Sequence, residues 1–192
     1  MKRRTAFTKQ DLHDLQAFAL SVGLEFAEDT TVEQTRRRVC VHEAGHAVMY
    51  LGFGLEGWRI ELRGEGAESF IPPVPIKPEV MILMSLGGPL AEASLCGPKG
   101  VLVGALDDVW QLTEAAEGQD LDGVRVLVQQ AHLEVAKREP QVLLIADILD
   151  ETGSFAWDGV GGAAPGAAAR SSSPRKKARG RRSGRSLTLV SG

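Results

Sequence analysis

The spacing of apolar positions divides most of the chain into segments with helical periodicity. Near the start, Leu12, Leu15 and Ala19 recur three and four residues apart. Thr8 precedes them as a capping residue, and Gly23 follows them as a natural stop. Apolar side chains at this spacing form one face of a helix. On the same criterion the sequence predicts further helices at about 30–53, 79–96, 109–116, 120–135 and 141–150.

Two segments depart from this pattern. Residues 58–62 alternate between apolar and polar side chains, which predicts a half-buried strand, and Gly64 and Gly66 then mark a turn. Residues 159–192 are rich in Gly, Ala, Ser and Arg, so they bury too little apolar surface to fold by themselves. We therefore expect a mainly α-helical domain with a small β-strand or hairpin element over residues 1–155. A disordered basic tail would follow over 156–192.

Charge is distributed unevenly along the 192 residues. Residues 1–169 hold 14 basic and 25 acidic side chains, whereas the last segment holds 8 basic and no acidic ones. The basic cluster at 175–182 has no interleaved aromatic residues to stack on bases, so we expect at most weak, non-specific contact with nucleic acid. A solvated tail is the simpler interpretation.

Composition also bears on the compartment. Two cysteines give no disulfide framework, which favours a reducing environment. The longest apolar run, 80–91, is too short to span a bilayer, and the N-terminal residues do not have the pattern of a signal peptide. The sequence therefore predicts a soluble, cytoplasmic protein without stable membrane insertion.

The second predicted helix carries the motif His42-Glu43-Ala44-Gly45-His46. Two histidines four residues apart lie on one helix face, so both imidazoles can bind one metal ion. Glu43 can hold and deprotonate a water on that ion, as in the HExxH motif of zinc peptidases. In a random chain of this composition the pattern would occur about 0.006 times. Gly45 costs a helix about 1 kcal/mol relative to alanine, which indicates a packing or access reason.

Two histidines leave a catalytic zinc one protein ligand short, because such sites use three plus a water. The candidates for the third ligand are Glu92, Asp107, Asp108, Asp120 and Cys96. Glu92 would ligate from a separate helix, and Asp108 would ligate from the start of a helix after a loop. Periodicity does not choose among the candidates.

Other residues with metal-binding or charged groups have simpler interpretations. His13 and His132 lack partners at metal-ligand spacing, so we expect surface or packed side chains. The run Arg36–Arg38 is expected to be a solvated helix face.

Two further stretches follow the motif at fixed spacing. One is Gly87-Gly-Pro-Leu-Ala-Glu-Ala-Ser-Leu-Cys-Gly-Pro98, similar to a GGRxAEExxxGP pattern; the other begins Gly104-Ala-Leu-Asp-Asp108 and ends Leu112-Thr113, similar to GAxxDxxxAT. Together with the stretch Val41–Val48, they resemble the peptidase domain of the FtsH-type ATP-dependent zinc metallopeptidases. The resemblance covers about residues 36–116.

The resemblance implies a helical zinc-peptidase domain in which His42, His46 and Asp108 bind Zn²⁺ and Glu43 is the general base. The activity would be that of a metalloendopeptidase, with Glu43-assisted attack of a zinc-bound water on peptide bonds of unfolded or flexible proteins. The strand at 58–64 would form the edge of the cleft and pair with an extended polypeptide substrate.

Departures from the family pattern leave an alternative open. The sequence has no Walker A motif, Pro89 replaces the usual arginine, Leu112 replaces an alanine, and the segment before the third helix is short. A peptidase without its own ATPase would cut flexible chains or act with a separate ATP-driven unfoldase. The alternative is a non-proteolytic metal-containing binding protein that acts through its surface or basic tail. A further possibility is that the two histidines only pack in a helix.

Overall fold

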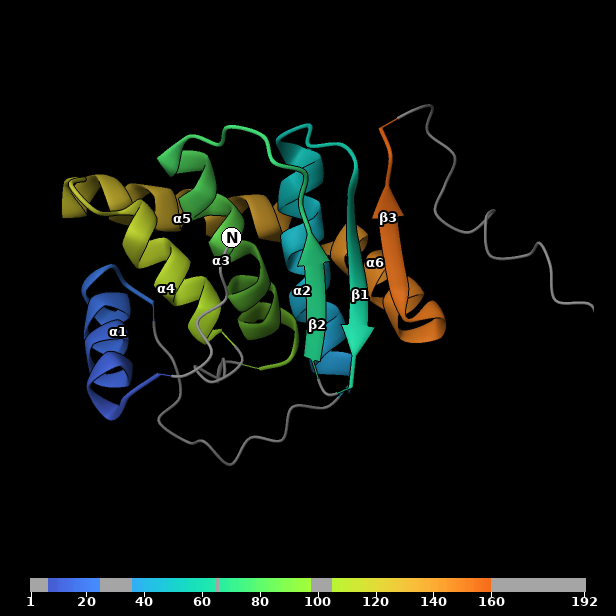
Figure 1. The fold of residues 1–192 in the computed structure, drawn as a ribbon, viewed down its shortest axis with the longest axis horizontal. Coiled ribbons are helices and arrows are strands. Elements are labelled where there is room, and N and C mark those ends of the chain that lie inside the picture. Colours follow the sequence, from blue (N-terminus) through green and yellow to red (C-terminus); the bar gives the residue numbers. More distant parts are fainter. Residues whose placement is uncertain (1–6, 25–35, 65, 98–104, 160–192) are drawn as a thin grey trace, which may run out of the picture.

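The computed structural model describes residues 7–24, 36–64, 66–97 and 105–159, and these ranges contain six helices and three strands (Figure 1). The helices are α1 Lys9–Ser21, α2 Arg36–Gly52, α3 Pro78–Leu95, α4 Leu106–Ala115, α5 Leu121–Lys137 and α6 Glu139–Thr152. The strands are β1 Trp58–Arg63, β2 Gly66–Phe70 and β3 Ser154–Trp157. The expectation of a mainly α-helical chain with a small β element is confirmed.

All the predicted helices occur. Thr8 caps α1 through a capping box, because its hydroxyl accepts from the backbone N–H of Asp11 and the Asp11 carboxylate accepts from that of Thr8. α3 continues through Pro89, although proline inside a helix favours a bend or an interruption. The predicted start of the second helix at Thr30 and the basic tail from residue 160 onward lie outside the described residues.

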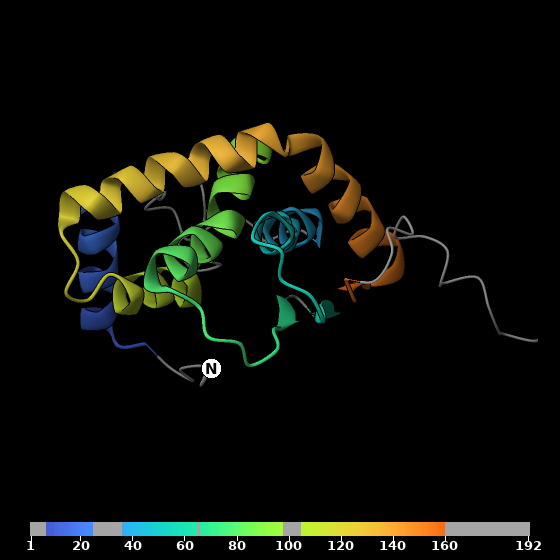
Figure 2. The same cartoon turned by 90° about the horizontal axis from the view of Figure 1, so that it is seen from above.

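α2 is the central helix of the fold. Every residue from Cys40 to Tyr50 except Glu43 is buried. A helix that is apolar on all sides belongs in the core. In Figure 2, α2 is seen nearly end-on, and it packs against α3, α6 and the sheet. α3 is buried without a break from Ile82 to Glu92, so it also belongs to the core.

Two glycines set the distance between α2 and α3. A Cβ atom on Gly45 would lie 2.2 Å from the carbonyl oxygen of Gly87, and one on Gly87 would lie 2.6 Å from that of Gly45. Neither position therefore has room for a side chain. The helices are in backbone contact, which accounts for Gly45 in the middle of a helix and for Gly87 opposite it.

The three strands form an antiparallel sheet in the order β2-β1-β3. Ile60 of β1 pairs with Ser69 on one side and with Phe155 on the other. Directly paired residues point to the same face of a sheet, and Ile60 and Phe155 are buried there. This register therefore turns Ser69 toward α2.

The sheet differs from the prediction in two respects: β3 was not expected, and the strand at 58–64 is not at an edge. β3 is short and follows α6 directly through Gly153, whose φ of 75° suits glycine, and it extends across the expected boundary at residue 155. Because β1 pairs with β2 on one side and with β3 on the other, the strand at 58–64 cannot pair with a substrate. Among the described strands, the edge strands are β2 and β3. In the described part of the chain, no helix is both long and apolar enough to cross a membrane.

Candidate metal centre

Three side chains from two helices point their metal-binding atoms at one another. α2 supplies His42 and His46, and the first turn of α4 supplies Asp108. The Nε2 atoms of the two histidines are 3.2 Å apart, and each lies close to an Asp108 oxygen, 3.0 Å for His42 and 3.2 Å for His46. The three residues form a group able to hold a metal ion.

These separations suit a tetrahedral ion. Four ligands at zinc–nitrogen and zinc–oxygen bond lengths lie about 3.3 Å from one another, close to the observed spacing. Two neutral imidazoles and a carboxylate are a common donor set for zinc, although the same set also suits Fe²⁺. The donor atoms therefore fit a metal ion, but do not identify it.

The other ring nitrogens of the histidines also have partners. Nδ1 of His42 lies 3.2 Å from a carboxylate oxygen of Glu92, and Nδ1 of His46 lies 2.8 Å from the carbonyl oxygen of Met84. Acceptors at Nδ1 favour the tautomer with its proton there, which leaves the Nε2 lone pair for a metal. Acceptors on α3 therefore orient both imidazoles through their Nδ1 atoms, on the side opposite Nε2.

Arg38 completes this arrangement and corrects one expectation. Its guanidinium donates to Oε1 of Glu92, the oxygen that does not contact His42, from Nε at 2.9 Å and from Nη2 at 2.7 Å. The Arg38 side chain is 13% exposed and that of Glu92 2%, so this is a largely buried ion pair. The prediction of a solvated face holds for Arg36 and Arg37, which pair with exposed aspartates of α6, but is wrong for Arg38.

Because Gly88 has no side chain, the space next to the two Nε2 atoms stays open. A Cβ atom at this position would lie 2.4 Å from Nε2 of His46 and 2.6 Å from Nε2 of His42. Any larger residue would displace the imidazoles or fill the region on which their lone pairs converge. The second glycine of the pair therefore serves the site, whereas the first serves helix packing.

The protonation of the cluster follows from its charges. Burial favours the neutral form of His42, but hydrogen bonds to Asp108 and Glu92 outweigh it and raise the pKa of His42 to about 10. Burial likewise opposes ionisation of Asp108, yet the neighbouring His46 and His42 hold the pKa of this carboxyl well below its usual range. A bound cation would displace protons from the imidazoles.

Glu43 is on α2 between the histidines but faces the sheet. Ser69 of β2 donates a hydrogen bond of 3.0 Å to one Glu43 oxygen, and Ser69 in turn interacts with the hydroxyl of Tyr50. Tyr50 is buried and stacks on the His46 ring, with centroids 6.2 Å apart. Burial, together with the Glu43 and Asp108 carboxylates, raises the pKa of Tyr50, which keeps its hydroxyl protonated.

No protein-family model matches this sequence, and no curated protein matches it. The motifs and the geometry of the site are therefore the observations that bear on function.

Of the five candidates for a third ligand, the structure places Asp108 at the histidines. Glu92 is close but faces Nδ1 of His42, on the side away from the cluster. Asp120 caps α5, and Cys96 follows the last turn of α3. Sequence reasoning missed the roles of Arg38, Gly88 and Ser69. Of these only Gly88, within a glycine pair in a helix, gave any signal in the sequence.

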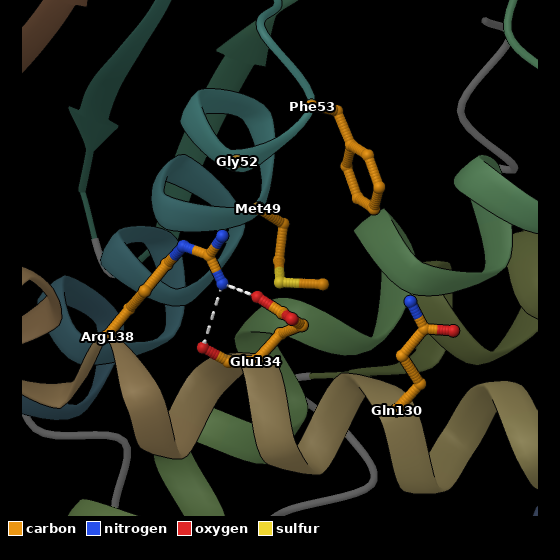
Figure 3. A pocket seen from close by; sticks show the side chains of 6 residues that line it. All are labelled: Met49, Gly52, Phe53, Gln130, Glu134 and Arg138. Atoms are coloured by element: carbon orange, nitrogen blue, oxygen red, sulfur yellow. Dashed lines mark hydrogen bonds and ion pairs between the residues drawn. The ribbon is translucent and has the colours of Figure 1, made fainter.

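A separate pocket of about 120 Å³ lies between the end of α2 and α5 (Figure 3). Its walls combine apolar and polar side chains: Met49, Gly52, Phe53, Gln130, Glu134 and Arg138. Arg138 forms an ion pair with Glu134. None of the predicted site residues lines this pocket. The two other described histidines, His13 and His132, are exposed and away from the cluster, as expected.

Proposed function

We propose that this protein is a zinc-dependent metallopeptidase that hydrolyses peptide bonds in unfolded or flexible polypeptides. The observation that carries the proposal is the convergence of His42, His46 and Asp108, with Glu43 between the two histidines on α2. Three protein ligands are the number found in catalytic zinc sites, in which the fourth position is left to water or substrate. The general-base position of Glu43 favours hydrolysis over the iron chemistry that the same three donors also suit.

In this mechanism zinc supplies Lewis acidity, which lowers the pKa of water and polarises the carbonyl of the peptide. Glu43 takes up the proton of the attacking water and passes it to the leaving amine. Ser69 donates to one Glu43 oxygen and leaves the other for this proton transfer. Glu92 and Met84 hold the imidazoles in place from the opposite side.

The sheet supports an extended substrate. β2 is an edge strand, and its Ser69 contacts Glu43, so the free edge nearest the base belongs to β2. An extended polypeptide can add to such an edge through backbone hydrogen bonds, which are tolerant of sequence. This mode requires an unfolded chain, so folded substrates would need a separate ATP-driven unfoldase.

The test compares zinc content and hydrolysis of an unfolded casein-like substrate in four proteins. We expect about one zinc per wild-type chain. Glu43→Gln should keep the zinc, and its rate of hydrolysis should fall at least about 100-fold, because general acid–base catalysis contributes that much. Asp108→Ala should lose both zinc and activity. Glu117→Gln, at an exposed position, is the matched control and should change neither.

The low exposure of His42 and His46, 7% and 6%, favours a second candidate, a non-proteolytic binding protein with a structural metal. Structural zinc sites are closed, whereas catalytic ones keep an open position. A chain that holds one zinc and cleaves nothing, with Glu43→Gln identical to wild type, would reject the peptidase in favour of this candidate. Iron in place of zinc would reject the zinc assignment.

A further inference from the structure

The outward face of α5 carries large apolar side chains that the metal centre does not use. The inward face is buried and consists of Val124, Val128, Ala131 and Val135. On the opposite face Val126 and Leu133 are 62% and 71% exposed. Seven residues apart, they lie two turns apart on one line of the helix. Figure 2 shows α5 along the outside of the molecule, with no described element beyond it.

The residues on this outward face are arranged symmetrically about the middle of α5. Val126 and Leu133 are equally far from the 129–130 peptide bond, and Asp122 and Lys137 are equally far from it beyond them. In an antiparallel pair of identical helices, residues equally far from the midpoint face each other. Such a pair joins Val126 to Leu133 twice and Asp122 to Lys137 twice.

We propose that the outward face of α5, defined by Asp122, Val126, Leu133 and Lys137, is a self-association surface on which a second copy of this chain docks antiparallel. Each copy contributes two apolar side chains and two opposite charges. A parallel arrangement would instead place Asp122 beside Asp122 and Lys137 beside Lys137, and like charges in contact disfavour it. The inference is independent of the proposed peptidase activity.

The contacts within one chain are compatible with this docking. Arg125 donates to Asp122 at 2.6 Å and to the backbone carbonyl of Ser21 at 2.9 Å, which ties the start of α5 to α1. The Asp122 side chain remains 80% exposed, so a lysine from a second copy has access to it. Gln130, which is also on α5, lines the pocket of Figure 3 together with Phe53.

The size of the surface sets the strength of the dimer. α5 has 17 residues, so it is about 25 Å long. Two helices of this length bury less area than the interfaces of stable complexes, which hide about 1,200–2,000 Å². The dimer is therefore a weak, reversible one, with a dissociation constant in the micromolar range or above.

Sedimentation equilibrium of the full chain, at concentrations from about 5 to about 500 μM, tests whether two copies associate. The average mass should rise with concentration from 20.6 kDa toward twice that value. Leu133→Glu should weaken association at least tenfold. Leu144→Glu changes a similarly exposed leucine on α6, 55% exposed, and should leave it unchanged. Circular dichroism and the melting temperature of each variant verify that it is folded.

A charge swap tests the antiparallel register. Asp122→Lys and Lys137→Asp should each weaken the dimer several-fold, whereas the double variant restores both ion pairs and should recover wild-type association. A constant mass of one chain at every concentration would assign this face to some other partner and overturn the proposal. Association that is indifferent to Leu133→Glu, or a double variant weaker than both single ones, would overturn it as well.

Discussion

The two sides of α2 that carry the motif are built differently. His42 and His46 face α3 and α4, where Glu92, a backbone carbonyl and Asp108 contact their ring nitrogens, and both are nearly fully buried. Glu43 faces the sheet, is partly exposed, and accepts a hydrogen bond from Ser69 on an edge strand. The side proposed to bind metal is part of the core, whereas the side that carries Glu43, the proposed base, contacts the edge strand β2.

This difference separates folding and metal binding from chemistry. Changes on the side of α3 and α4 should alter stability and metal content together, because the same buried groups serve both. Changes on the side of the sheet should alter the reaction while leaving the fold and the metal in place. The four predictions below test that separation.

The largest effect is expected from Gly88→Ala. Its Cβ atom would meet Nε2 of both histidines at 2.4 and 2.6 Å, so metal binding should be lost. Metal content of the purified variant measures this directly. The control is Gly123→Ala in α5, where an added Cβ meets nothing within 4 Å, and this variant should keep its metal. It should even gain up to about 1 kcal/mol in unfolding free energy. A Gly88→Ala protein with full metal content would contradict the assigned role.

Arg38→Met should destabilise the fold next most strongly. It leaves the buried Glu92 carboxylate without its guanidinium partner, and breaking a buried ion pair in this way costs about 3–5 kcal/mol. Chemical denaturation measures the loss. Arg37→Met removes an exposed ion pair to Asp147 and should cost less than about 1 kcal/mol. Equal losses in the two variants would show that Arg38 is not a buried partner.

Removal of the metal should lower the melting temperature by roughly 10 °C, for zinc at about 1,000 times its dissociation constant. The difference in melting temperature between metal-loaded and metal-free protein should depend on pH. Without metal, the pKa of His42 is about 10 in the folded protein and 6.5 in the unfolded chain. The ion pairs of His42 therefore stabilise the fold fully below pH 6.5, and this stabilisation is lost as the pH rises toward 10. Zinc requires deprotonated ligands, so its contribution grows with pH.

The difference between loaded and chelated protein should therefore widen from pH 6 to pH 8, as scanning calorimetry would show. A gap that narrows over this range would contradict the ligand assignment, because it would mean that protons and metal do not compete for the same atoms.

The smallest expected effect is that of Ser69→Ala. Loss of one hydrogen bond to the Glu43 carboxylate should lower kcat by about tenfold, while KM, zinc content and stability stay close to wild type. Ser69→Thr keeps the hydroxyl on a strand that tolerates a branched side chain and should restore most of the rate. Steady-state kinetics with zinc analysis separates the outcomes. A simultaneous loss of zinc would place Ser69 with the metal-binding side instead.

The sequence by itself determined the local elements and the chemical motif. Periodicity predicts each helix because burial of one helix face repeats every three to four residues, and Thr8 and Asp120 mark starts because caps act within one turn. The spacing of His42 and His46 is also a local property, since four residues are one turn. Their convergence on one side of α2 therefore follows without any tertiary contact.

The tertiary structure decided which distant residues meet these elements. Of the five possible third ligands, Asp108 is at the histidines, 66 residues beyond His42, because α4 packs against α3. Neighbouring charges predict a solvated Arg38, but its side chain is largely buried because α3 places Glu92 beside it. β3 pairs with the second edge of β1 from nearly 100 residues away, so β1 is enclosed and β2 and β3 are the edge strands, while the β1–β2 register places Ser69 at Glu43. Contacts of this kind depend on helix packing and strand order, which no local pattern in the sequence specifies.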